Sequence, residues 1–126
     1  MAESGGSRRA KLSKAAREDL RDVLRWSEEQ FGSKAAARYR QLLAQVFRDL
    51  EADPDRPGSR QRPELADGVR TYHLAFSRDR VAGVKVKRPR HFLLFRIRGS
   101  VVEVARILHD SRDLALHLPD DFIAPG

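Results

Sequence analysis

The spacing of apolar residues changes once along the chain, and this change limits the possible folds more than any other feature. Between residues 13 and 50, apolar side chains recur in steps of three and four, the spacing of one face of an α-helix. From residue 69 to residue 108 they alternate instead, as in a β-strand with one covered face. Helices followed by strands in a chain of 126 residues predict a single α+β domain.

The first half predicts two helices that form an antiparallel hairpin. Ser13 suits the N-cap of the first helix, whose apolar stripe ends at Phe31, and Gly32 suits its C-terminal stop. Ser33 is then the expected cap of the second helix. The stripe of that helix consists of Ala36, Tyr39, Leu43, Val46, Phe47 and Leu50. Because the junction is so short, the second helix is expected to fold back along the first.

The second half predicts a small antiparallel sheet of three to four strands. Strong alternation marks residues 70–76, 91–98 and 101–108. Residues 81–90 contain a glycine and a proline, so they suit either an edge strand or a loose loop. Residues 111–118 predict a short C-terminal helix that ends before a proline.

A two-residue turn is expected to set the register of the last two strands. Gly99-Ser100 fits a type II′ hairpin turn, which places Phe95 opposite Val104 and Arg96 opposite Glu103. One face of the hairpin then collects the apolar residues Phe95, Ile97, Val102 and Val104. The helices are expected to pack on this face.

Composition excludes several classes of protein. The chain has no cysteine, and therefore no disulfide, thiolate nucleophile or sulfur-based zinc site. Its four histidines lack the spacing of a metal-ligand pair on one helix, so neither a metal nor another cofactor is expected. No apolar stretch approaches the about 20 residues of a membrane-spanning helix, and the N-terminus is not a secretory signal. We expect a cytoplasmic protein without membrane contact.

The charge and the ends of the chain add two expectations. A net charge of +7 favours anionic partners, either nucleic acid or an acidic protein segment. The small polar residues 1–8 are expected to be a flexible leader, residues 9–119 the domain and residues 120–126 a C-terminal tail.

Several short motifs follow one another in the order found in one family. The segment Arg106-Ile107-Leu108-His109, followed two residues later by Arg112-Asp113, resembles the closing strand of ParE-like toxins of type II toxin–antitoxin systems. Leu12-Ser13, Ala16 and Asp19-Leu20 are similar to the start of that family's first helix. The loop that leads into its sheet is similar to Leu50, Pro54, Gly58, Arg62, Glu64-Leu65 and Gly68-Val69-Arg70. The resemblance covers residues 8–119 and extends to the wider RelE/ParE superfamily, although the Val81–Arg90 segment is longer and the leader is extra.

The resemblance implies a fold, a partner and a target. The fold is a helical hairpin on a small antiparallel sheet. The partner is a ParD-like antitoxin, usually a DNA-binding protein whose acidic, partly disordered tail wraps the toxin in a hetero-oligomer. The target is DNA gyrase for ParE-like members and ribosome-bound mRNA for RelE-like ones. We therefore expect a toxin that inhibits gyrase by binding. The alternatives are a RelE-like mRNA endonuclease and a non-toxic basic module that binds nucleic acid or protein.

The two toxin hypotheses use overlapping residues. A gyrase-binding toxin needs no catalytic residue, and Arg96, His109 and Arg112 are its candidate target contacts. An endonuclease needs a base, charge stabilisation and a proton donor, for which His109 and the arginines Arg96, Arg106 and Arg112 are candidates. RelE-like enzymes often have a tyrosine or histidine near the C-terminus, and here both tyrosines come earlier, at Tyr39 and Tyr72. A hydrogen-bonding role for His109 at the end of its strand is an equally good interpretation.

Four residues have expected roles outside the target site. Arg106 lies opposite Leu93 in the expected register, on the apolar side, where its charge needs a partner. Asp110 or Asp113 is the expected partner, and the three residues would form a structural clamp on the C-terminal turn. Trp26 lies off the stripe of the first helix, and we expect it to be exposed and to contact the antitoxin, since tryptophan is enriched at interface hot spots.

Overall fold

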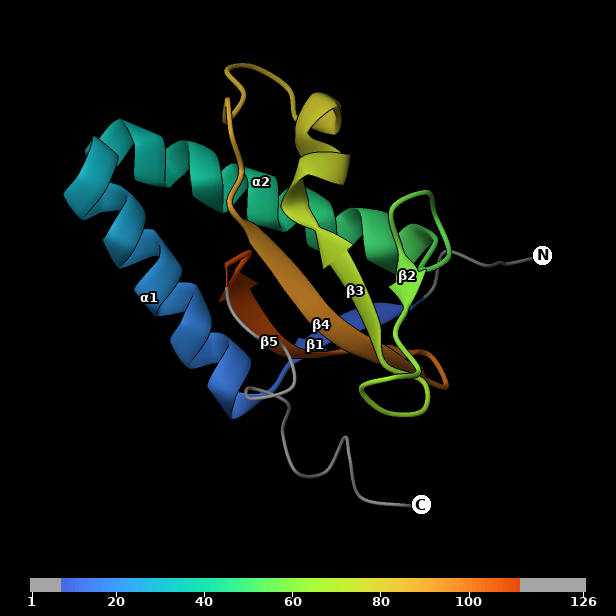
Figure 1. Cartoon of the computed structure of the whole chain (residues 1–126). Helices are drawn as coiled ribbons and strands as arrows, with labels where there is room; N and C mark the ends of the chain where they lie inside the picture. Colours follow the sequence, from blue (N-terminus) through green and yellow to red (C-terminus); the bar gives the residue numbers. More distant parts are fainter. Residues whose placement is uncertain (1–7, 112–126) are drawn as a thin grey trace.

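The structure is a computed structural model that describes residues 8–111. In chain order the elements are β1 (Arg9–Leu12), α1 (Lys14–Phe31), α2 (Ser33–Ala52), β2 (Arg60–Gln61), β3 (Arg70–His73), the 3₁₀ helix η1 (Leu74–Arg80), β4 (His91–Arg98) and β5 (Val101–His109). The two helices pack as a hairpin against one face of the sheet (Figure 1). The α+β class and the helical hairpin are thus confirmed.

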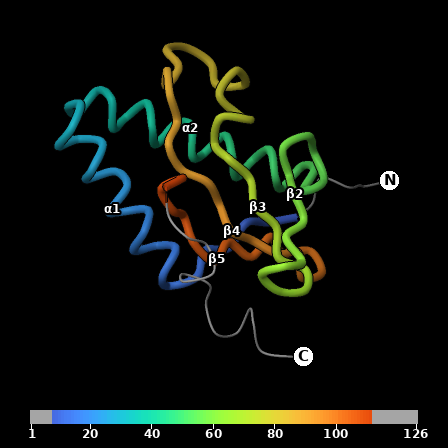
Figure 2. The backbone as a smooth tube through the Cα atoms, in the orientation of Figure 1, coloured from blue at the N-terminus to red at the C-terminus, as the bar shows by residue number. Residues whose placement is uncertain are grey.

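The sheet is larger than predicted, because the N-terminal segment adds a strand. Its five strands lie in the order β1-β5-β4-β3-β2. β1 runs parallel to β5, while the other neighbouring strands are antiparallel. The prediction of three to four antiparallel strands missed the four residues of β1 and the two of β2, which are too short to show a period. The path from the helices to the last strand can be followed in Figure 2.

The helix boundaries agree with the predicted caps except at the second helix. The Ser13 side chain accepts a hydrogen bond from the Ala16 backbone N–H, as an N-cap does. Gly32, with a φ of +94°, ends α1 and also stands at the N-cap position of α2. The prediction that Ser33 caps α2 is wrong, because Ser33 is already its first helical residue. Phe31 is exposed rather than buried, since it is the last residue of α1 before the turn.

The core lies between the helices and the predicted face of the β4–β5 hairpin. The buried stripe of α2 meets a buried strand face, and the residues of this core include Tyr39, Leu42, Leu43, Val46, Leu50, Phe95, Val102 and Val104. Burying one such aliphatic or aromatic side chain contributes about 1.5–3 kcal/mol, so this interface supplies much of the driving force for folding. A smaller cluster of Val69, Leu94 and Ala105 lies apart from it.

A β-bulge divides the β4–β5 hairpin into two registers. Near the turn the predicted pairs are present, with Arg96 opposite Glu103 and Phe95 opposite Val104. The next pair is Leu94 with Arg106, which leaves Ala105 as an extra residue. The prediction that Arg106 faces Leu93 is therefore wrong, because the bulge shifts the register by one residue. Beyond the bulge the alternation is reversed, and the later side chains of β5 change faces.

The start of α1 holds the bulge in place. The Ser13 hydroxyl donates to the Ala105 carbonyl oxygen at 2.8 Å. Six residues later, Asp19 accepts the Ile107 backbone N–H at 2.9 Å and two bonds from the Arg106 guanidinium, at 2.7 and 2.9 Å. A bulge leaves backbone groups without ladder partners, and these α1 side chains satisfy two of them.

Two predicted strand segments have other structures. The strand expected over residues 70–76 ends at His73, where the imidazole Nδ1 accepts the Ala75 N–H and starts η1. Phe76 is consequently exposed instead of lying in the core beside Tyr72. Residues 81–90 form a loop, which is one of the two alternatives left open. The expected helix over residues 111–118 lies beyond the described residues, apart from Ser111.

No helix within residues 8–111 combines the length and the apolar character needed to cross a membrane.

The Asp19 anchor gives a direct test of the fold. Replacing Asp19 by Ala leaves the Ile107 N–H without its acceptor and removes a charge partner of the partly buried Arg106. We expect a loss of about 2–4 kcal/mol in the free energy of unfolding, measured by urea denaturation. Asp22→Ala is the matched control, because the exposed Asp22 pairs only with the exposed Arg25 among the described residues and should cost under about 0.5 kcal/mol. Equal losses in the two variants would contradict the anchoring role.

Candidate functional site

A cluster of aromatic and imidazole rings lies where β4 begins and β5 ends. His91 and His109 are paired across these strands, with their ring centroids 5.3 Å apart. Trp26 of α1 packs edge-to-face against both, at 5.3 and 6.1 Å. Tyr39 of α2 packs against His91 at 5.4 Å. His109 belongs to this cluster because the bulge turns the end of β5 toward the helices.

The inner half of the cluster is buried and holds its protons in fixed places. The Tyr39 hydroxyl accepts the Arg90 backbone N–H at 2.9 Å and lies 2.7 Å from His91 Nδ1, to which we assign the hydroxyl proton. Burial lowers the pKa of His91 to about 4 and raises the pKa of Tyr39 to about 12. His91 is consequently a neutral imidazole with its proton on Nε2, and Tyr39 stays protonated at neutral pH.

The outer half of the cluster is polar and partly exposed. His109 Nδ1 accepts the Ser111 backbone N–H at 3.2 Å and lies 2.8 Å from the Ser111 hydroxyl oxygen. Asp110 contacts His73 Nε2 and the Arg90 guanidinium, both at 3.1 Å. Although burial alone would raise the pKa of Asp110, the bond from His73 and the charge of Arg90 lower it. Asp110 is thus an ionised carboxylate that ties the end of β5 to β3 and to the residue before β4.

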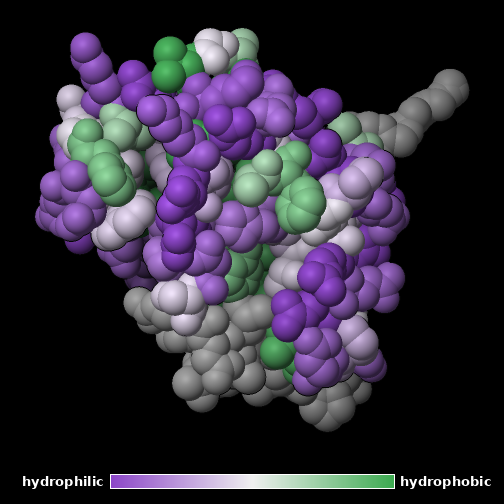
Figure 3. All heavy atoms as spheres, turned by 45° about the horizontal axis from the view of Figure 1, so that its top comes forward, coloured by the Kyte–Doolittle hydropathy of each residue, from purple (hydrophilic) through white to green (hydrophobic). Residues whose placement is uncertain are grey.

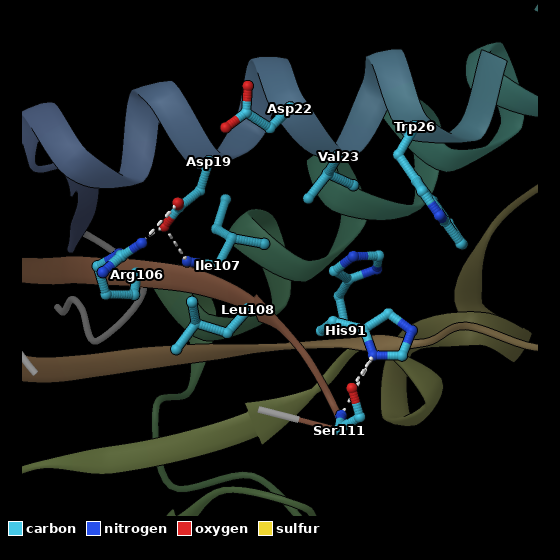
Figure 4. A pocket seen from close by; sticks show the side chains of 10 residues that line it. Asp19, Asp22, Val23, Trp26, His91, Arg106, Ile107, Leu108 and Ser111 are labelled. Carbon is cyan, nitrogen blue, oxygen red and sulfur yellow. Dashed lines mark hydrogen bonds and ion pairs between the residues drawn. The ribbon is translucent and has the colours of Figure 1, made fainter. Parts of the chain in front are cut away.

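A cavity of about 480 Å³ opens between α1 and the end of β5, beside these rings. Figure 4 shows Asp19, Val23 and Trp26 of α1 pointing toward β5. The lining residues are Asp19, Asp22, Val23, Trp26, His91, Arg106, Ile107, Leu108, His109 and Ser111. In its neutral form His109 carries its proton on Nε2, because Nδ1 is an acceptor, so it can offer a hydrogen bond to a bound group.

The structure separates the residues that the sequence grouped as one target site. Arg96 pairs with Glu103 at 2.7 Å, and its neighbours Phe95 and Ile97 face the helices. Its side chain therefore projects from the opposite face of the sheet, whereas His109 lies on the helix side. Arg112 lies outside the described residues. Arg96 and His109 do not form a common site.

Arg106, the centre of the expected clamp, has an acidic partner that the sequence did not suggest. Arg106 forms an ion pair with Asp19 of α1, and this bond raises the pKa of the Arg106 guanidinium. Asp110 is instead held by His73 and Arg90, so the prediction that it pairs with Arg106 is wrong. Asp19 takes this place because it accepts the Arg106 guanidinium and the neighbouring Ile107 backbone N–H together. Asp113, the other expected partner, lies outside the described residues.

Trp26 is half-buried rather than fully exposed, because Phe31, Tyr39 and both clustered histidines surround it. Sequence reasoning missed Asp19 and Tyr39 as members of the site. A signal for Asp19 was present, since Ala16, Asp19, Val23 and Trp26 follow one another at helical steps along one side of α1. A carboxylate in such a row requires a partner on the element beneath it.

A second, larger cavity of about 710 Å³ lies on the other side of Trp26. This cavity lies between residues 84–90 on one side and the end of α1 and the start of α2 on the other. In the described part of the chain, no group of three histidine, aspartate or glutamate residues is arranged to hold a metal ion.

The low pKa of His91 can be checked by NMR. Histidine resonances followed from pH 7.5 to pH 3.5 should show His91 titrating near pH 4, against an ordinary value of 6.5. Because the unfolded chain then binds more protons between pH 6.5 and pH 4, the free energy of unfolding should fall as the pH decreases through this window. Trp26→Ala opens the cluster to water and should raise the His91 pKa. A His91 midpoint near 6.5 in the unaltered protein would contradict the buried, neutral imidazole.

Comparison with known proteins agrees with this architecture. The solved structure of a chromosomal ParDE TA system from P. aeruginosa is similar in fold, with a TM-score of 0.61 at 19% sequence identity, over 82% of this chain and 97% of that chain. No curated protein matches the chain. The family model for the ParE toxin of type II toxin-antitoxin system, parDE, matches residues 10–114, which is most of the chain. The chain therefore belongs to the ParE toxin family of type II toxin–antitoxin systems.

Proposed function

We propose that this toxin acts by binding DNA gyrase in the cytoplasm, without bond-breaking chemistry of its own, and that a ParD-like antitoxin neutralises it. Gyrase is the target that the ParE-like motifs imply. The observation that carries the choice of binding over catalysis is the separation of Arg96 from His109 by the sheet. Surface contact with a large target tolerates such a separation, since one interface spans many residues on several elements.

Ribonuclease chemistry makes stricter demands. Attack by an RNA 2′-hydroxyl needs a base, a cation at the phosphate and a proton donor within hydrogen-bond reach of one reacting group. Of the expected set, Arg96 projects from the other face, and Arg106 is bound to Asp19. The buried Tyr39 and His91 are bonded to each other, and the high pKa of Tyr39 opposes its use as a base. These features weigh against an endonuclease.

The mRNA endonuclease is nevertheless the second candidate, because one observation favours it. His109 and Arg106 both line the cavity between α1 and β5, so an imidazole and a guanidinium are near each other at an open surface. The two candidate functions can be told apart by their products. A gyrase inhibitor leaves RNA uncut, whereas an mRNA endonuclease cuts RNA in the absence of gyrase.

The antitoxin contact follows from charge and from the position of Trp26. The net charge of +7 on the toxin would attract an antitoxin whose C-terminal segment is acidic. Trp26 is half-buried and borders both cavities, which is the environment of an interface anchor. We propose Trp26 as an antitoxin contact in a toxin–antitoxin hetero-oligomer, and Arg112 and His109 as target contacts.

A purified system separates the candidates. We expect the full-length chain, released from its antitoxin, to inhibit DNA supercoiling by gyrase and to leave mRNA on translating ribosomes uncut. Arg112→Glu should raise the inhibitory concentration about tenfold or more, because it reverses a charge at the proposed interface.

Arg21→Glu provides the matched control, since Arg21 is exposed on α1 and lines neither cavity. Its inhibitory concentration should stay within about twofold of the unaltered chain. Cut mRNA together with unimpaired supercoiling would overturn the gyrase proposal in favour of the nuclease. If the chain neither inhibits supercoiling nor cuts mRNA, both toxin proposals fail and a binding role without toxicity is left.

A further inference from the structure

The larger cavity is a groove with one wall from the helical hairpin and the other from residues 84–90. We call it the basic groove. Its lining residues are Trp26, Ser27, Phe31, Ala35, Arg38, Tyr39, Val84, Lys85, Val86, Lys87, Arg88, Arg90 and His109. The outer wall belongs to the Val81–Arg90 segment, which is longer than in the ParE-like chains that the sequence resembles.

The floor of the basic groove is apolar and open to solvent. Phe31 is 67% exposed and Val84 is 60% exposed. Only three large apolar side chains are exposed among residues 8–111, and these are two of them. Hydrophilic residues cover most of the face drawn in Figure 3, and hydrophobic residues form small patches there. Exposed large side chains that converge in one cavity mark a binding surface better than scattered ones do.

The rim of the basic groove is cationic. It contains Arg38, Lys85, Lys87, Arg88 and Arg90, and no carboxylate is among the lining residues. Arg90 is engaged by Asp110. Lys87, Arg88 and Arg38 are exposed, and no carboxylate within residues 8–111 pairs with them. Their charge is therefore available to an external acidic group.

The outer wall is already in place before anything binds. Val81 is buried, and Val86 packs against the main core. Arg78 Nε donates to the Val86 carbonyl oxygen at 2.6 Å, and the Arg90 N–H is bonded to Tyr39. A wall held at these points loses little conformational entropy on binding, which favours affinity.

We propose that the basic groove binds an amphipathic acidic helix of the antitoxin, and that Val84, Lys87 and Arg88 determine which antitoxin is accepted. The inference rests on the proposed function only in taking an acidic antitoxin as the partner. Apolar residues at helical spacing would enter the floor, while carboxylates on either side would meet the rim.

The floor favours a peptide over nucleic acid. Single-stranded nucleic acid binds through aromatic faces on which bases stack. Here Trp26 makes edge-to-face contacts with Phe31, Tyr39 and His91, and the remaining apolar lining is aliphatic, from Ala35, Val84 and Val86. A floor in which the exposed ring of Phe31 lies among aliphatic side chains, with lysines and arginines around it, suits leucine-like side chains flanked by carboxylates.

Trp26 supplies a local signal for the test, because it is the single tryptophan of the chain and lines the groove. The probe is a synthetic helical peptide of about 15 residues, with leucines on one face and glutamates on the other. Two matched peptides replace either every leucine by serine or every glutamate by lysine. We expect the leucine–glutamate peptide to shift the Trp26 emission saturably, and each matched peptide to bind about tenfold more weakly or worse.

The double variant Lys87→Glu/Arg88→Glu should weaken the leucine–glutamate peptide about tenfold or more. Val84→Asp should weaken the binding of this peptide about tenfold as well, because it places a negative charge on the apolar floor. The control with equal charge change is Arg21→Glu/Arg48→Glu, whose residues are exposed outside the groove. Its affinity should stay within about twofold. Equal weakening in both double variants, or equal binding of the serine peptide, would overturn the inference in favour of unspecific charge attraction.

Two further outcomes keep this inference apart from the proposed function. Saturable quenching of Trp26 by single-stranded oligouridine, with no response to the peptide, would assign the groove to nucleic acid and overturn the inference. The same groove variants should still inhibit gyrase, because Val84, Lys87 and Arg88 are not among the proposed target contacts. Failure of the unaltered chain to inhibit gyrase would sink the target proposal while leaving the peptide result intact.

Discussion

The bonds from Asp19 to the β-bulge of β5 are the interaction on which the rest of the site depends. Asp19 joins the first helix to the last strand through the Ile107 N–H and the Arg106 guanidinium. Without the bulge, strict alternation would place His109 on the face away from the helices. With it, His109 meets His91 and Trp26, and the two cavities on either side of Trp26 share these rings. The Asp19 carboxylate thus stabilises the register of the β4–β5 hairpin, and this register determines which residues surround Trp26.

This arrangement is better suited to binding than to catalysis. The buried imidazole is neutral, the buried phenol is bonded to it, and a guanidinium near the opening is paired with Asp19. Such groups stiffen the surface around Trp26, and a stiff surface loses less entropy when it docks. The arginine on the far face of the sheet belongs to a separate surface. Trp26, the proposed antitoxin contact, and His109, a proposed target contact, lie side by side on this surface, and binding either partner there requires no reaction centre.

The sequence predicts the layers of this fold well and its irregularities poorly. The helical hairpin, the Gly99-Ser100 turn and the strand face with Phe95 follow from period and turn chemistry, which are local properties. The bulge at Ala105 depends on bonds from Ser13 and Asp19, more than 80 residues away, so no local pattern reveals it. The bulge accounts for two errors at the site: the facing residue of Arg106 and the grouping of Arg96 with His109. The basic groove was missed because residues 81–90 form a loop whose position depends on the helices.

We propose that this ParE-family toxin acts by binding gyrase rather than by cutting RNA. Tightly controlled expression of the unaltered chain in bacteria, with the DNA damage response and cellular mRNA followed together, measures it most directly. Gyrase inhibition should give filamentous cells with an induced DNA damage response and intact mRNA. Arrested translation with mRNA cut on ribosomes, and no DNA damage response, would contradict it.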